Sequence, residues 1–372
     1  MTDNKYTYPI FALLFYCFAG VFPTHAQQKA ENDSNIIKGS LLIVPFATYQ
    51  EETSFAPGVS FACHFKSNDY GRISSLNGFA TYTFRHQFVF QASPKIYFRD
   101  TKWFLYGHLS LRNYTDRFYG IGNQPTDLKQ PYVAQTFGID LQPQYETGKD
   151  LFVGPNICYE YEKIEPGESF SENRDVIFDN YGKTGWEKPY GRLALGLAGM
   201  YNKRDNTFYT RKGYFAKLVY NVAVAGIGST YTTHRLTADY RHFLPVFNSH
   251  TLAWQACINV VWGKEIPFSS LPTVGGSDFL RGFRQGVYRD NCMFVLQAEY
   301  RMPVYKRFKS VIFLSAGDVL NSGNAHIEKL KVSYGVGLRF RYNDAGAHLR
   351  FDVAKNNYGD DFQFYLTASE AF

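Results

Sequence analysis

Apolar residues recur at every second position along most of the chain, in segments of about ten residues bounded by Gly, Pro, Asn or Asp. This period is that of a β-strand, because neighbouring side chains of a strand point to opposite faces of the sheet. About sixteen such segments occur, an even number as expected for a bacterial barrel. Their starts lie near residues 40, 57, 75, 87, 102, 133, 150, 190, 213, 231, 250, 291, 308, 330, 345 and 361. The pattern predicts an all-β chain.

The two faces of these predicted strands differ in chemistry. In the segment Val332–Tyr342 the even-numbered residues are apolar, whereas the odd-numbered residues include Arg339 and Arg341. The segment that starts near residue 291 also carries charge on one face, at Glu299 and Arg301. Such strands suit a transmembrane barrel with a polar lumen. A soluble β-sandwich, which buries its apolar face as a core, would show the same period.

Composition favours the barrel. Aromatic residues make up 18% of the chain, with 29 Tyr and 34 Phe, yet the mean hydropathy of -0.30 is that of a water-soluble protein. A transmembrane barrel accounts for both values, because lipid-facing and lumen-facing residues average out while aromatic girdles lie at the membrane interfaces. We therefore expect a transmembrane antiparallel β-barrel in contact with the lipid bilayer of the outer membrane.

The N-terminal residues predict export. The one continuous apolar run, residues 10–22, follows Lys5 and precedes Ala26, a small residue at a suitable cleavage position. The run is too short for a comfortable membrane span and is typical of a secretory signal. We expect a signal peptide at residues 1–26, a short polar lead at residues 27–38 and the barrel over residues 39–372, with no periplasmic domain ahead of the barrel.

Charge and side-chain chemistry argue against several other classes of protein. The net charge of +6 includes no run of like charges, so nothing favours a nucleic-acid partner. The five Cys lie far apart, the nine His show no metal-ligand spacing, and no G-x-S-x-G motif occurs. We therefore expect no metal, no cofactor and no enzymatic activity.

The loop from Val274 to Phe283, with the sequence VGGSDFLRGF, resembles the arginine-glycine-phenylalanine loop of the BamA/TamA bacterial surface antigen family. Further matches follow in the family's order: residues 204–206 (RDN), residues 212–214 (KGY), Glu299 shortly before Pro303, Phe313 with residues 317–318 (GD), residues 335–339 (GVGLR) and residues 349–354 (LRFDVA). The resemblance covers residues 201–372, and residues 118–123 (FYGIGN) extend it weakly toward the N-terminus.

The resemblance implies a sixteen-stranded barrel in which the loop near residues 265–291 folds back into the lumen. It implies that Arg281 pins this loop to the inner wall, with Gly282 and Phe283 completing the motif. A guanidinium offers a planar fork of donors that suits a wall carboxylate. Glu299 is the expected partner, since it faces inward on the strand that follows.

Two other carboxylates stay open as partners of Arg281. Members of the family often carry Asp two residues after the position of Phe313, where this chain has Ser315. Asp318 and Asp352 are therefore alternative lock partners.

The closing segment carries aromatic and aliphatic residues at alternate positions. Phe364 and Leu366 alternate with polar residues, and the segment finishes at Phe372. We expect these three residues to form a C-terminal signal for assembly of the barrel. Such a signal predicts how the protein is inserted and leaves its function open.

Two function classes follow. The resemblance implies a component that assists outer-membrane protein assembly or protein translocation, acting on unfolded outer-membrane or exported proteins. Because the family's periplasmic repeats are not expected in this chain, a separate periplasmic partner would deliver those substrates. The alternative is a passive pore or structural surface barrel without insertase activity, and an outer-membrane lipid hydrolase is a remote third option.

Overall fold

The computed structural model describes residues 40–50, 54–66, 72–98, 101–124, 129–167, 170–181, 185–186, 188–247, 249–321, 327, 330–342, 346–359, 362–367 and 370–372. The signal peptide and the polar lead predicted for residues 1–38 lie outside this part of the chain.

Sixteen strands form one antiparallel sheet, and neighbours in the sheet follow one another along the chain. The one exception among the described residues is that β11 pairs with β14, because β12 and β13 form a separate small sheet. The strands of this sheet are β1 (Ser40–Gln50), β2 (Ser54–Lys66), β3 (Ile73–Tyr82), β4 (Phe88–Tyr97), β5 (Trp103–Phe118), β6 (Gln130–Gly148), β7 (Leu151–Pro166), β8 (Tyr190–Arg204), β9 (Gly213–Ala223), β10 (Thr233–Val246), β11 (His250–Gly263), β14 (Cys292–Tyr305), β15 (Phe308–Leu320), β16 (Lys331–Arg341), β17 (His348–Asn356) and β18 (Gln363–Thr367). Each strand starts within three residues of the start predicted from the sequence. The predicted all-β fold with about sixteen strands is confirmed.

Burial alternates along the strands as the sequence predicts. On β16, Tyr334, Val336 and Leu338 keep 53%, 57% and 52% of their surface exposed, whereas Ser333 and Arg339 are fully buried. A sandwich core would bury the apolar residues instead. The sheet therefore has an apolar outer face and a polar interior, which is the arrangement of a membrane barrel.

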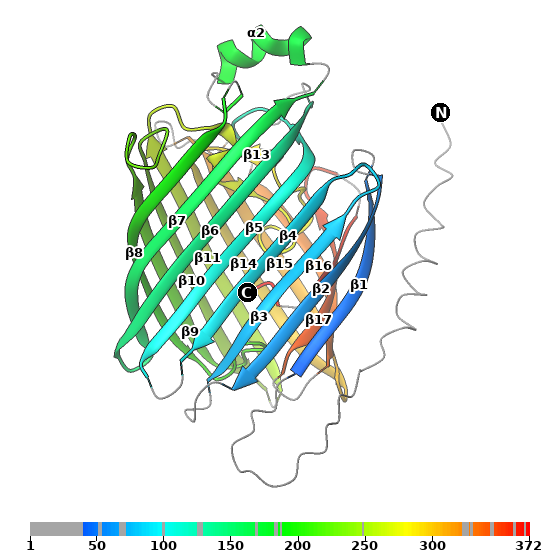
Figure 1. Ribbon diagram of the computed structural model, residues 1–372. Coiled ribbons are helices and arrows are strands. Elements are labelled where there is room, and N and C mark those ends of the chain that lie inside the picture. Colours follow the sequence, from blue (N-terminus) through cyan, green and yellow to red (C-terminus); the bar gives the residue numbers. More distant parts are fainter. Residues whose placement is uncertain are drawn as a thin grey trace, which may run out of the picture.

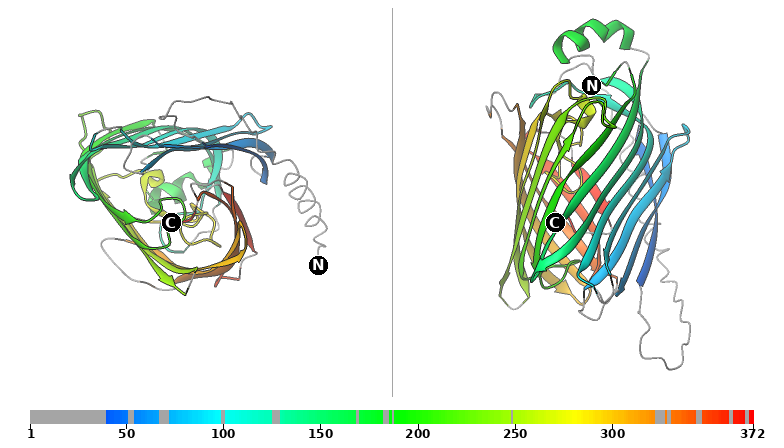
Figure 2. Two further views of the ribbon diagram at one scale, coloured as in Figure 1. Left: turned by 90° about the horizontal axis from the view of Figure 1, so that it is seen from below. Right: turned by 60° about the vertical axis from the view of Figure 1, so that its left-hand side comes forward.

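The sheet curls until its first and last strands lie on the same side of the molecule, as the left view of Figure 2 shows. β18 pairs with β17 through five residue pairs, from Arg350 with Thr367 to Ala354 with Gln363. Among the described residues, no hydrogen-bonded register joins β1 to β18. We call this junction the seam.

The two ends of the barrel differ. Helix α2 (Phe170–Tyr181), in the connection between β7 and β8, stands above one end (Figure 1). Strands β4, β6, β8, β10, β14 and β16 finish at the opposite end. We call these the α2 end and the turn end. No helix in the described ranges is long and apolar enough to cross a membrane.

The connection between β11 and β14 lies inside the barrel, as the family resemblance implies. It contains the 3-10 helix η1 (Phe268–Ser270) and two short strands that pair with each other, β12 (Thr273–Val274) and β13 (Tyr288–Arg289). The left view of Figure 2 shows this yellow segment within the ring of strands. We call residues 264–291 the inward loop.

Candidate functional site

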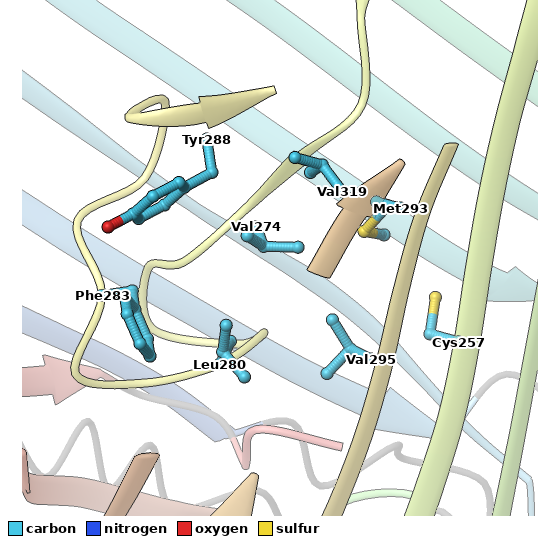
Figure 3. Close-up of a cluster of buried hydrophobic side chains, with 8 residues drawn as sticks. All are labelled: Cys257, Val274, Leu280, Phe283, Tyr288, Met293, Val295 and Val319. Carbon is cyan, nitrogen blue, oxygen red and sulfur yellow. The ribbon is translucent and has the colours of Figure 1, made fainter. Parts of the chain in front are cut away.

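The tip of the inward loop is shaped by a buried apolar cluster and a glycine. Leu280 and Phe283 belong to a cluster that includes side chains of β11, β14 and β15 (Figure 3). Gly282 adopts a φ of 105°, and a Cβ there would lie 3.2 Å from the carbonyl of Lys355. Glycine is therefore needed at this position. Together, the cluster and the turn set the direction in which Arg281 leaves the loop.

Arg281 points at the wall and is fully buried. Its Nη1 donates to Asp352 Oδ2 at 2.6 Å, and its Nη2 donates to Glu299 Oε1 at 2.7 Å. The guanidinium carbon lies 3.6 Å from the centroid of the Phe313 ring. Because Glu299 belongs to β14 and Asp352 to β17, one side chain connects the loop to two separate wall strands.

These contacts extend into a network of ion pairs. Arg301 donates to Glu299 at 2.8 Å, and Arg339 donates to Asp352 at 2.6 Å. The members of this network are Arg281, Arg301, Arg339, Arg350, Asp278, Glu299, Asp352 and Glu370. Four positive and four negative charges are thus brought together in a region where a buried unpaired charge is strongly unfavourable.

The structure brings Arg281 together with two of its three candidate partners, Glu299 and Asp352. Asp318 pairs instead with Lys331, whose ammonium also donates to the main-chain oxygen of Asn123 at 3.0 Å. That second contact ties residues 118–123 to the same region of the wall. The family match at these residues therefore lies near the inward loop in space.

A second anchor holds the inward loop to the opposite part of the wall. The Ser269 hydroxyl donates to Glu162 of β7, which also accepts a hydrogen bond from Tyr190 of β8. Arg235 of β10 donates to the main-chain oxygen of Ser270 at 2.5 Å. This anchor was not predicted from the sequence, because a pair of serines carries neither a period nor a family motif.

The connection between β8 and β9, residues 205–212, is held by side-chain to main-chain hydrogen bonds. Asn206 Oδ1 accepts the N–H of Phe208 at 2.7 Å, and Asp205 Oδ1 accepts the N–H of Arg211 at 3.0 Å. Asp and Asn commonly shape turns by accepting such main-chain hydrogen bonds, and here they belong to the RDN motif. We call this connection the β8–β9 turn.

The β8–β9 turn contacts strands on both sides of the seam. The ring centroid of Phe208 lies 4.2 Å from that of His64 on β2, and the Tyr209 centroid lies 4.5 Å from that of His348 on β17. The main-chain oxygen of Thr210 accepts a hydrogen bond from Arg301 at 3.4 Å. The turn therefore touches the charge network as well as the strands near the seam.

Residues 370–372 lie in the lumen, and we call them the tail. Glu370 accepts a hydrogen bond from Arg339 Nε at 2.7 Å, and Arg301 donates to the main-chain oxygen of Phe372 at 3.1 Å. The Phe372 ring packs against Phe243, with the centroids 6.3 Å apart. The left view of Figure 2 accordingly has the C label within the ring of strands.

The three residues predicted as an assembly signal lie in different places. Phe364 and Leu366 face outward on β18, with 49% and 39% of their surface exposed, whereas Phe372 is 5% exposed. Because β18 ends at Thr367, the alternation that would direct Phe372 outward does not continue to it. Their role as a signal stays a prediction.

Sequence and structure comparisons identify relatives of this arrangement. A family model described as the Omp85 superfamily domain matches residues 65–372. No curated protein matches the chain in a sequence search.

The fold is similar to three solved barrels. BamA from Haemophilus ducreyi, in a form lacking POTRA domains 1-3, matches with a TM-score of 0.58 and 16% identity over 88% of this chain and 69% of that one. CdiB from Acinetobacter baumannii matches with a TM-score of 0.53 and 10% identity, over 90% of this chain and 58% of its own. CdiB from Escherichia coli matches with a TM-score of 0.51 and 8% identity, over 90% of this chain and 60% of its own. The family model and the sixteen-stranded sheet agree, and the chain belongs to the Omp85 superfamily of outer-membrane β-barrels.

Proposed function

We propose that the protein assists the insertion of proteins into the outer membrane or their export across it, with the seam and the inward loop as working parts. The observation that carries this proposal is the incomplete seam, where β18 contributes five paired residues and no register joins β1 to β18 in the described ranges. Unpaired strand edges are unfavourable in lipid. A strand of a client protein can satisfy such an edge by pairing with it.

The Arg281 contacts support a role of the inward loop at the seam. Arg281 reaches β17 through Asp352, and the N–H of Gly282 donates to the Tyr365 hydroxyl of β18 at 2.9 Å. The loop is thus bonded to both of the last two strands. We propose that Arg281, Gly282, Phe283 and Glu299 form a lock that holds these strands in the closed position.

The two ends suggest an orientation and partners. Outer-membrane barrels carry short periplasmic turns and longer extracellular loops. On that basis the α2 end faces the outside and the turn end faces the periplasm. Unfolded outer-membrane or exported proteins, delivered by a separate periplasmic partner, would then reach the seam from the turn end.

A reconstitution assay tests the proposal. The purified chain is placed in liposomes, a urea-unfolded eight-stranded outer-membrane barrel is added, and its folding is followed by protease protection. We expect faster folding than in liposomes that hold an unrelated sixteen-stranded porin. Arg281→Ala should change this acceleration, while Arg284→Ala, on the exposed side of the same loop, should preserve it. Equal rates with the porin would contradict the proposal.

A passive pore is the second candidate, and a lumen cavity of about 640 Å³ favours it. The inward loop and the tail narrow the same lumen, so a pore would conduct only around them. Planar-bilayer recording separates the two functions. Steady conductance of KCl without any acceleration of folding would establish the pore.

A further inference from the structure

The lumen cavity of about 640 Å³ has a charged lining. It lies between the inward-facing side chains of the wall, the β8–β9 turn and the tip of the inward loop. Lumen walls of barrels normally carry charges of both signs, so charge alone does not indicate a ligand. The arrangement of the charges here is more informative.

Besides Arg235, which donates to the main-chain oxygen of Ser270, three cations from three other strands line the cavity without ion pairs in the described part of the chain. Lys95 of β4 has no hydrogen-bond or ion-pair partner there, and the Lys217 ammonium of β9 lies 4.1 Å from the centroid of the Tyr106 ring. Arg204 of β8 donates to the amide oxygen of Asn202 at 2.8 Å. Each side chain therefore retains donors for another acceptor.

Most carboxylates of the lining are paired with other residues, although Asp140 and Asp239 lie close enough to attract Lys217, and Asp278 lies close enough to attract Lys95. Asp239 pairs with Arg241 at 2.5 Å, and Glu160 pairs with Arg192 at 2.9 Å. The remaining lining carboxylates, Asp278 and Glu370, belong to the network around Arg281. Within the described ranges, this leaves Asp140 as the one lining carboxylate without an ion pair, and it already accepts hydrogen bonds from Gln142 and Asn156.

The cations also act on one another. Arg204, Arg241 and Lys217 all lie close enough to repel the charge of Lys95, and Asp278 lies close enough to attract it. Like charges held together destabilise a fold unless a counter-charge joins them. The rings of the lining hold the cations in place, with the Arg204 guanidinium 4.7 Å from the centroid of Phe215. A low-dielectric wall around such a cluster concentrates its field on the cavity.

We propose that this cavity binds a multivalent anion, either a phosphate or a carboxylate compound, that enters from the turn end. Its oxygens accept charge-assisted hydrogen bonds from Lys95, Lys217 and Arg204 and add to the counter-charge of the nearby carboxylates. The site is independent of the proposed function, because an assembly component and a passive pore would both contain it.

Calorimetric titration of the purified chain in detergent, at fixed ionic strength, tests the site with two probes. Inorganic pyrophosphate represents the phosphate class and citrate the carboxylate class. We expect saturable binding of at least one probe, weakened about tenfold or more by Lys95→Gln and by Lys217→Gln, since each removes one charge-assisted contact. Lys203→Gln is the matched control, because Lys203 is the exposed sequence neighbour of Arg204 and should leave binding unchanged.

Heat-dependent migration of the folded band separates a binding role from a structural one. Lys95→Gln should keep or slightly raise the unfolding temperature of the unliganded protein, because it relieves repulsion, while the stabilisation by the probe falls. The probe that binds identifies the anion class. Absence of binding by both probes, or equal binding by the Lys95→Gln and Lys203→Gln variants, would overturn the proposal.

Discussion

Replacement of Arg281 by alanine should destabilise the barrel more than any other single change in the inward loop. The substitution removes one positive charge from a balanced network and takes a partner from both Glu299 and Asp352. Breaking a buried ion pair typically costs about 3–5 kcal/mol. The lost stacking on Phe313 adds about 1–2 kcal/mol in a desolvated site. Each carboxylate keeps one close arginine, so we expect a total loss of about 3–5 kcal/mol.

The assay is unfolding of the purified barrel in detergent, followed by loss of the compact band in denaturant. Arg284→Ala is the control on the same loop, and its exposed side chain predicts a change below about 1 kcal/mol. A double variant tests the charge argument. Adding Asp352→Asn to Arg281→Gln restores neutrality and should recover part of the stability. If the double variant is as unstable as the sum of its single variants, charge balance does not explain the contacts of Arg281.

Three further predictions concern the segments that meet in the lumen. Gly282→Ala should destabilise the barrel by about 1–3 kcal/mol because of its positive φ and close wall contact, whereas Gly199→Ala, with open space around it, should cost under about 1 kcal/mol in the same denaturant assay. Glu370→Gln should release the tail, because the substitution removes the charge of the side chain that binds Arg339. Mass spectrometry after carboxypeptidase digestion should then show faster removal of the last residues. Tyr209→Ala removes a side chain that is 7% exposed, so it should destabilise the turn end by about 3–5 kcal/mol. Hydrogen exchange at the start of β17 should then become faster. Unchanged exchange there would contradict a stabilising role of the β8–β9 turn.

The wall was predictable from the sequence because its signal is local. The alternation of apolar and polar residues predicts the start of every strand to within three residues. The same alternation places Glu299 and Arg301 on the inner face. Helix α2 was not predicted, since the residues between Pro166 and Pro189 show no clear apolar face. A periodic sequence pattern arises where one face of an element is buried along its whole length. A short helix in a loop buries little of its surface and therefore shows no such pattern.

The partners of the charged residues were only partly predictable. The alternation along each strand places Glu299, Asp318 and Asp352 on the inner face of the sheet. It does not predict which of these carboxylates pairs with Arg281. Asp318 is excluded by Lys331, a residue thirteen positions away on the next strand that pairs with it. Pairings of this kind depend on strand register and on the path of the loop, and neither is encoded in a local pattern.

Arg301 is the point at which the three lumen segments meet. Its Nε donates to Glu299, which also holds Arg281, while its Nη1 and Nη2 donate to the main-chain oxygens of Thr210 and Phe372. Because Glu299 is shared, withdrawal of the inward loop leaves an unbalanced carboxylate beside the arginine that binds both the β8–β9 turn and the tail. A buried network tolerates such an imbalance poorly. The inward loop, the turn and the tail are therefore energetically coupled, and an opening of the seam that displaces one of them has to shift the other two.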